Sequence, residues 1–292
     1  MKIVALLLLL MASAPAAAHA GHTHEAPGWT LDLSVTGPLM LALVIYVAGF
    51  VRLWARSTRG RPVLRNQAIL YALGWLSLVI ALVSPLHQAG ERSFAFHMVE
   101  HEIIMLISAL LLVASRSGPA LLWAFPAAAR ATLGRLGSWN LWRKLADPVV
   151  ATAVQGAAIW AWHAPGLFNM ALHDEGWHVV QHLSFLVSAL FFWWAMVHGR
   201  SRGAHVTAAV CLFVTSMVGG GLGALMALSN SPWYRDYAML EMTPWGLTPE
   251  QDQQVAGLIM WVPGGLFHLA AALWFMLRAL RENEVSHAAS PL

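Results

Sequence analysis

The sequence predicts an all-α integral membrane protein, a bundle of seven transmembrane helices that follows a cleaved N-terminal signal peptide. The composition is that of a membrane chain, because 58% of the residues are hydrophobic, only 11% are charged and the mean hydropathy is +0.60. Seven apolar runs approach or exceed the ~20 residues that a helix needs to cross a bilayer. They lie near residues 35–55, 67–86, 94–115, 149–164, 177–197, 205–228 and 255–277, and the fourth is the shortest.

Residues 1–20 have the pattern of a signal peptide. Lys2 precedes a short apolar run at residues 3–11, and small residues lead to Ala18-His19-Ala20, an ending that suits signal peptidase. An uncleaved eighth helix is the alternative, which the shortness of the run disfavours. The mature chain would then comprise a short His-containing extracytoplasmic tail, a seven-helix membrane domain and a cytoplasmic tail, at residues 21–34, 35–280 and 281–292.

The basic residues independently indicate the orientation. If the seven spans alternate from an external N-terminus, most Lys and Arg residues fall in cytoplasmic loops, as the positive-inside rule requires. In the mature chain only Arg92 and Arg235 fall outside. The cytoplasmic set is Arg52, Arg56, Arg59, Arg61, Arg65, Arg116, Arg130, Arg135, Arg143, Lys144, Arg200, Arg202, Arg278 and Arg281. The net charge of +3 therefore reports topology rather than nucleic-acid binding.

Two histidine pairs with i,i+4 spacing lie just inside the outer ends of the third and fifth spans. The pairs are His97 with His101 and His178 with His182. At a rise of ~1.5 Å per residue, His97 and His101 lie roughly 5–12 Å below the outer surface, and the second pair lies at similar depth. His163 ends the fourth span on the same side. Side chains this polar are costly in hydrocarbon, so two pairs at one depth indicate a metal or haem site.

Helical geometry adds further candidate donors to this site. At 100° per residue, His97, His101 and Met105 form one ladder along the third span. Glu100 lies to one side of the ladder, within reach of the same cavity, and Met260 in the seventh span supplies another thioether. Imidazole with thioether favours copper, particularly Cu(I), while imidazole with carboxylate also suits zinc.

Each of these signals also has a purely structural interpretation. An intramembrane histidine can hydrogen-bond across helices, and methionine is an ordinary gap filler. His22 and His24 could capture metal near the mature N-terminus, but a short His-containing tail is a weak signal. Cys211 is the only cysteine, which excludes an intrachain disulfide and a CxxC metal shuttle. The sequence has no phosphate-binding glycine loop or nucleophile elbow, so we do not expect an enzyme.

Several motifs, in order on matching spans, resemble those of one family. The chain resembles the multi-spanning CtaG family of cytochrome c oxidase assembly factors, which is associated with caa-type oxidases. The resemblance rests on Ser84-Pro85-Leu86-His87, Phe96-His97-Met98-Val99-Glu100-His101, Trp160-Ala161-Trp162-His163-Ala164-Pro165, His178 to His182 followed by Phe192-Trp193-Trp194, and Asp252-Gln253-Gln254-Val255-Ala256-Gly257-Leu258-Ile259-Met260-Trp261.

The resemblance implies a role in maturing the copper centre buried in oxidase subunit I, within the bacterial inner (cytoplasmic) membrane. The partners would be subunit I and other oxidase assembly proteins, in a lipid bilayer and without nucleic acid. Copper would be held by His97, His101, His178 and His182, with His163 at the mouth, Met105 and Met260 as soft helpers and Glu100 within reach. In that family the position of His87 often carries an acidic residue, so His87 is left outside the expected ligand set.

Two other functions fit the same residues. One histidine from each pair could be an axial ligand of haem b in a membrane electron carrier, because facing histidines at similar depth suit haem as well as copper. In the other alternative, the chain is a metal-free assembly scaffold whose histidines mediate helix contacts and docking. A haem absorption band would identify the electron carrier, and histidine replacements that leave the metal content unchanged would identify the scaffold.

Overall fold

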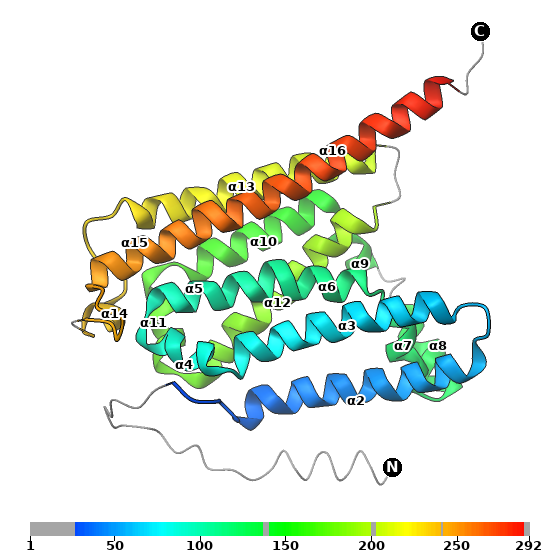
Figure 1. The fold of residues 1–292 in the computed structure, drawn as a ribbon, viewed down its shortest axis with the longest axis horizontal. Coiled ribbons are helices and arrows are strands. Elements are labelled where there is room, and N and C mark those ends of the chain that lie inside the picture. The colour runs from blue at the N-terminus through cyan, green and yellow to red at the C-terminus, as the bar shows by residue number, and fades with distance from the viewer. Residues whose placement is uncertain (1–26, 137–139, 200–202, 241, 289–292) are drawn as a thin grey trace.

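The computed structural model describes residues 27–136, 140–199, 203–240 and 242–288. Every regular element within these residues is a helix, and the longer helices run side by side as a bundle (Figure 1). This confirms the predicted all-α class. The predicted signal peptide at residues 1–20 and the histidines His22 and His24 lie outside the described residues.

Six helices of the described chain are long and apolar enough to cross a membrane. They are α2 (Leu33–Arg56), α3 (Arg61–Leu82), the continuous run of α5 (Phe94–Glu102), η1 (Ile103–Ser108) and α6 (Ala109–Ala114), then α12 (Glu175–Val197), α13 (Ala204–Ala227), and the run of α15 (Pro249–Ile259), η2 (Met260–Gly264) and α16 (Gly265–Ala288). They match six of the seven expected runs. The remaining run forms α10 (Pro148–Trp162), whose 15 residues are fewer than the ~20 of a full span.

Short helices connect the long ones at both ends of the bundle. Figure 1 shows α4 (Pro85–Arg92), α11 (Pro165–His173) and α14 (Arg235–Ala238) at one end. The opposite end carries α7 (Gly118–Trp123), α8 (Ala127–Leu136) and α9 (Asn140–Leu145). There the guanidinium groups of Arg56 and Arg130 lie 5.1 and 4.2 Å from the ring centroid of Trp123. These cation–π contacts hold the short helices against the end of α2.

Polar residues and prolines mark where several helices begin. At the start of α10, Asp147 accepts hydrogen bonds from two backbone N–H groups, and Pro148 occupies the first helical position. Thr248 and Gln251 form a capping box at the start of α15. At the start of α12, Asp174 accepts one hydrogen bond, from the backbone N–H of Trp177. These caps fix where the three helices begin, and one of them, α12, carries His178 and His182.

Glycines allow α13 to pack directly on α15. A Cβ atom at Gly223 would lie 2.6 Å from the carbonyl oxygen of Gly257, closer than real side chains approach a backbone. Small residues are the usual means by which membrane helices come this close. Gly219, four residues earlier, has no neighbour within 4 Å of such a Cβ atom, so only Gly223 of this pair makes the contact.

Two of the membrane helices contain a π-helical turn. η1 interrupts the third expected span and η2 interrupts the last one, where Pro263 lacks the N–H that a regular α-helix would use. Single π-helical turns of this kind occur frequently at functional sites. Both segments contribute residues to one buried cavity.

Candidate metal centre

Histidines from three helices meet inside the bundle at the end that carries α4. His97 and His101 come from α5, His178 and His182 from α12, and His87 from α4. The ring centroids of His97 and His101 are 4.3 Å apart, those of His178 and His182 are 4.4 Å apart, and the two pairs approach to 5.2 Å between His101 and His182. The two histidine pairs expected from the sequence therefore face each other.

Three of these histidines form a group that could hold a metal ion. His97, His178 and His182 each offer a ring nitrogen, and the three nitrogens lie within 4.8 Å of one another. Only 1% of the surface of His97 and 7% of that of His182 is exposed. At this separation the rings need only small rotations to converge on a single ion.

Several ring nitrogens of the cluster have no hydrogen-bond partner. They are Nε2 of His97, His178 and His182 and both ring nitrogens of His101. Buried polar atoms are nearly always paired, so a group of unpaired ones in one place requires an explanation. Unprotonated imidazole nitrogens are common metal ligands, and the donor set thus fits a transition-metal ion.

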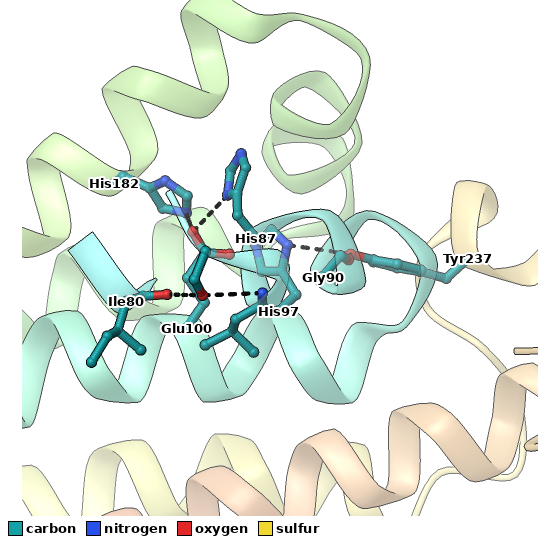
Figure 2. A network of polar contacts seen from close by, with 9 residues as sticks. Ile80, His87, Gly90, His97, Glu100, His182 and Tyr237 are labelled. Carbon is teal, nitrogen blue, oxygen red and sulfur yellow. Dashed lines mark hydrogen bonds and ion pairs between the residues drawn. The ribbon is translucent and has the colours of Figure 1, made fainter. Parts of the chain in front are cut away.

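Tyr237 of α14 determines which nitrogen of His97 is free. Its hydroxyl donates to the carbonyl oxygen of Gly90 at 2.5 Å and lies 3.3 Å from Nδ1 of His97 (Figure 2). Because the hydroxyl proton is used on Gly90, the hydroxyl oxygen accepts a hydrogen bond from Nδ1–H, which leaves Nε2 unprotonated. Partners of this kind orient metal-binding histidines and set their tautomer. The sequence alone did not indicate Tyr237.

Glu100 joins the two sides of the cluster. Nδ1 of His87 donates to Oε1 of Glu100 at 2.9 Å, and Nε2 of His182 lies 3.5 Å from the same oxygen (Figure 2). Glu100 is fully buried. Burial lowers the pKa of His87, but the hydrogen bond and the charge of Glu100 outweigh it and raise the pKa above its ordinary value. His87, left out of the expected ligand set, therefore belongs to the cluster as the partner of Glu100.

His163 lies at the edge of the cluster, directly after α10. Its Nδ1–H donates to the carbonyl oxygen of Ile159 at 2.7 Å, which leaves Nε2 unprotonated. This Nε2 lies 3.4 Å from the sulfur of Met98, and the ring centroid lies 6.4 Å from that of His101. An imidazole and a thioether are thus adjacent to the main group.

Comparison with known proteins identifies the family. The family model described as cytochrome c oxidase caa3 assembly factor (Caa3_CtaG) matches residues 44–282. The chain belongs to this family. The match contains every histidine of the cluster and confirms the resemblance drawn from the motifs. No curated protein and no solved structure gives a significant match.

For a caa3 assembly factor, the family description indicates work on components of cytochrome c oxidase. Its motif Asp252-Gln253 has a positioning role in this structure. Asp252 accepts hydrogen bonds from the Ser93 hydroxyl at 2.6 Å and from the backbone N–H of Phe94 at 2.5 Å, which fixes the start of α5. Gln253 accepts from the backbone N–H of Trp233 at 2.6 Å and so holds the segment that leads to Tyr237.

The assembly factor holds its two expected methionine donors apart from the histidine trio. Met105 and Met260 line a separate small cavity, and the sulfur of Met105 accepts a hydrogen bond from Nε2 of Gln155 at 3.3 Å. None of the clustered histidines lines that cavity. Met105 follows His101 by one helical turn, but it enters the other cavity, which Gln155 of α10 and Met260 of η2 line with it.

The histidine cluster of the assembly factor also borders a large apolar groove. The groove has a volume of about 660 Å³ and runs between α2, α3 and α12, with Leu39, Trp75 and Leu186 among its lining residues. His182 lines the same groove. One member of the cluster is thus shared between the polar site and an apolar surface of the membrane domain.

Proposed function

We propose that this caa3 assembly factor binds copper, as Cu(I), at the histidine cluster and supplies it to the copper centre of oxidase subunit I. The observation that carries this proposal is the convergence of unpaired ring nitrogens of His97, His178 and His182 within 4.8 Å of one another. Copper is the cargo here rather than a resident cofactor. Three donors that meet at one point suit an ion, whereas haem would need two donors on opposite faces of a porphyrin.

Reversible carriage follows from the surplus of donors around the trio. His101 contacts His97 and His182. His163 lies at the edge of the cluster, where its Nε2 contacts the sulfur of Met98. An ion held by three imidazoles keeps its coordination shell open to an incoming ligand. Neighbouring donors can therefore replace one another step by step, which lets copper leave without passing through an uncoordinated state.

The same proposal includes a topology. The signal peptide is removed, α10 completes a seven-span bundle in the bacterial inner membrane, and the N-terminus lies outside. Support comes from the distribution of charge, because the basic residues of the turn between α2 and α3, such as Arg59 and Arg61, lie at the end opposite to α4. The histidine cluster then lies in the outer leaflet, where it can accept periplasmic copper.

Delivery to subunit I would occur sideways within the membrane. The groove beside His182 is lined mostly by apolar residues of several membrane helices, which suits an apolar transmembrane segment of the oxidase. A client helix in this groove would bring its own ligands next to a histidine of the cluster. The ion would thereby stay out of bulk water during transfer.

The test is the metal content of the purified, detergent-solubilised protein after anaerobic exposure to Cu(I). We expect copper at the histidine cluster of the wild type and the loss of one ion per chain in His97→Ala/His178→Ala. The matched control is His205→Ala, because His205 pairs with Glu282 at the far end of the bundle. Circular dichroism establishes that each variant is folded, and mixing with copper-free oxidase then tests transfer.

Two results would overturn the copper proposal. A haem absorption band in the wild type would identify an electron carrier with axial histidines. Equal, negligible copper in the wild type and both variants, together with normal oxidase assembly in cells, would identify a metal-free scaffold.

A further inference from the structure

A small cavity, separate from the histidine cluster, lies deeper in the bundle, between the two π-helical segments. It has a volume of about 30 Å³. A cavity needs ~10–15 Å³ on this measure to hold one water molecule. This cavity therefore has room for a single ion but is too small for an organic cofactor. Its chemically active lining residues are Glu102, Met105, Gln155, Met260 and His268.

The two π-helical segments contribute one thioether each. Met105 belongs to η1 and Met260 to η2, and both are buried. The amide of Gln155 holds the Met105 side chain in place through the hydrogen bond to its sulfur. Thioethers are soft donors, which favour Cu(I) over sodium, magnesium or calcium.

Glu102 brings an unpaired carboxylate oxygen to the same cavity. Its Oε2 is shielded from solvent and has no hydrogen-bond partner. A Cβ atom at Gly264 would lie 2.7 Å from this oxygen, so the carboxylate packs against the backbone of η2. No Lys or Arg is among the described residues that line the cavity. A carboxyl group in such a place is costly unless a cation or a hydrogen-bond partner compensates it.

His268 supplies a nitrogen donor of defined tautomer. Its Nδ1–H donates to the carbonyl oxygen of Gly264 at 2.9 Å, which leaves Nε2 unprotonated. The ring of Trp193 stacks on the imidazole at 6.0 Å between centroids and 6° between planes, and so restrains its rotation. The spacing of Met260, Gly264 and His268 by four residues places all three on one face of the last helix.

We propose that this cavity is a second copper site, in which Met105, Met260, His268 and Glu102 hold one Cu(I) ion. One monovalent cation with one carboxylate is neutral overall, which a site in the apolar part of a membrane requires. The inference rests on the copper role proposed above and assigns the route: the ion passes from the histidine cluster to a second site ~6–12 Å further along the continuous helix of α5 and η1. His101 lies between the two sites, because its ring contacts His97 and His182 and Met105 follows it by one helical turn. Both of its ring nitrogens are unpaired and available to the ion.

The test is an anaerobic Cu(I) titration of the full-length protein in detergent, combined with X-ray absorption at the copper edge. The variant is Met105→Leu/Met260→Leu, which conserves volume and removes both sulfurs. The control is Met217→Leu/Met276→Leu, the same chemical change at two exposed positions of α13 and α16. We expect two copper ions in the wild type and the control but one in the variant, with the sulfur scattering lost.

The possible outcomes separate this inference from the proposed function. If the variant retains two ions, or if the wild type shows no sulfur ligand, the second site is refuted while the histidine site stands. If His97→Ala/His178→Ala keeps all its copper and only the methionine variant loses some, the histidine site is refuted and the cavity stands. Should the methionine variant fail to fold, Glu102→Gln replaces it, with the expected result again a loss from two ions to one.

Discussion

Replacing Tyr237 by phenylalanine removes a single oxygen atom beside the histidine cluster. The hydroxyl joins the Gly90 carbonyl at 2.5 Å and Nδ1 of His97 at 3.3 Å, while the ring packs against Phe94 at 5.3 Å between centroids. The ring contacts survive in Tyr237→Phe, but His97 loses the partner that fixes its tautomer. Loss of such a partner lowers metal affinity by ~10–100-fold, which corresponds to about 1.4–2.8 kcal/mol of binding free energy.

The assay is competition for Cu(I) against a chromophoric chelator, with Tyr234→Phe as the matched control. The hydroxyl of Tyr234 donates to the backbone carbonyl of His163 at 3.0 Å and does not contact an imidazole. Each variant leaves a buried carbonyl unpaired, which costs about 1–3 kcal/mol of stability in either case. We therefore expect similar losses of thermal stability but weaker copper binding only in Tyr237→Phe. Equal copper affinities in the two variants would refute the positioning role of Tyr237.

Three further substitutions test how the fold supports the site. Asp252→Ala leaves the first turn of α5 without its cap, and we expect a loss of ~1–3 kcal/mol together with reduced copper content, measured by thermal denaturation and metal analysis. Gly223→Ala forces α13 away from α15, and the expected cost is ~1–3 kcal/mol by the same melting assay. Leu186→Trp fills the apolar groove, so copper binding should persist while transfer to copper-free oxidase falls.

Control variants, and the results that would contradict them, test each of these three expectations. The Cβ atom of Gly221→Ala would meet no neighbour within 4 Å, so this change should be neutral or slightly stabilising. If Gly223→Ala melts at the same temperature as Gly221→Ala, the close contact between α13 and α15 does not contribute to stability. Val210→Trp adds the same bulk on the exposed face of α13, and transfer that falls equally in Val210→Trp and Leu186→Trp would argue against the groove. An unchanged copper content in Asp252→Ala would mean that the start of α5 does not control the site.

The membrane helices were largely predictable from the chain itself. An apolar run of sufficient length is favourable in a bilayer whatever surrounds it, so six runs correspond to helices that are long enough to span. The i,i+4 spacing likewise places His97 beside His101, because one helical turn separates them whatever the rest of the chain does. The fourth run was ambiguous because the prediction depends on length. Its helix, α10, has only 15 residues, so length alone does not decide whether it crosses the membrane.

Contacts between helices could not be obtained in this way, because they depend on how each helix is rotated and on which neighbour it meets. His87 and Tyr237 reach the site through α4 and α14, two short helices whose positions depend on the packing of the long ones. Glu102 and His268, which lie 166 positions apart in the numbering, share a cavity only because the end of α5 packs against η2, which leads into α16. Local patterns in the sequence thus determined the helices and the presence of a histidine site, whereas tertiary packing decided which donors share a cavity. The physical reason is that bilayer insertion and helical periodicity act within one segment, while donor convergence is a property of several segments packed together.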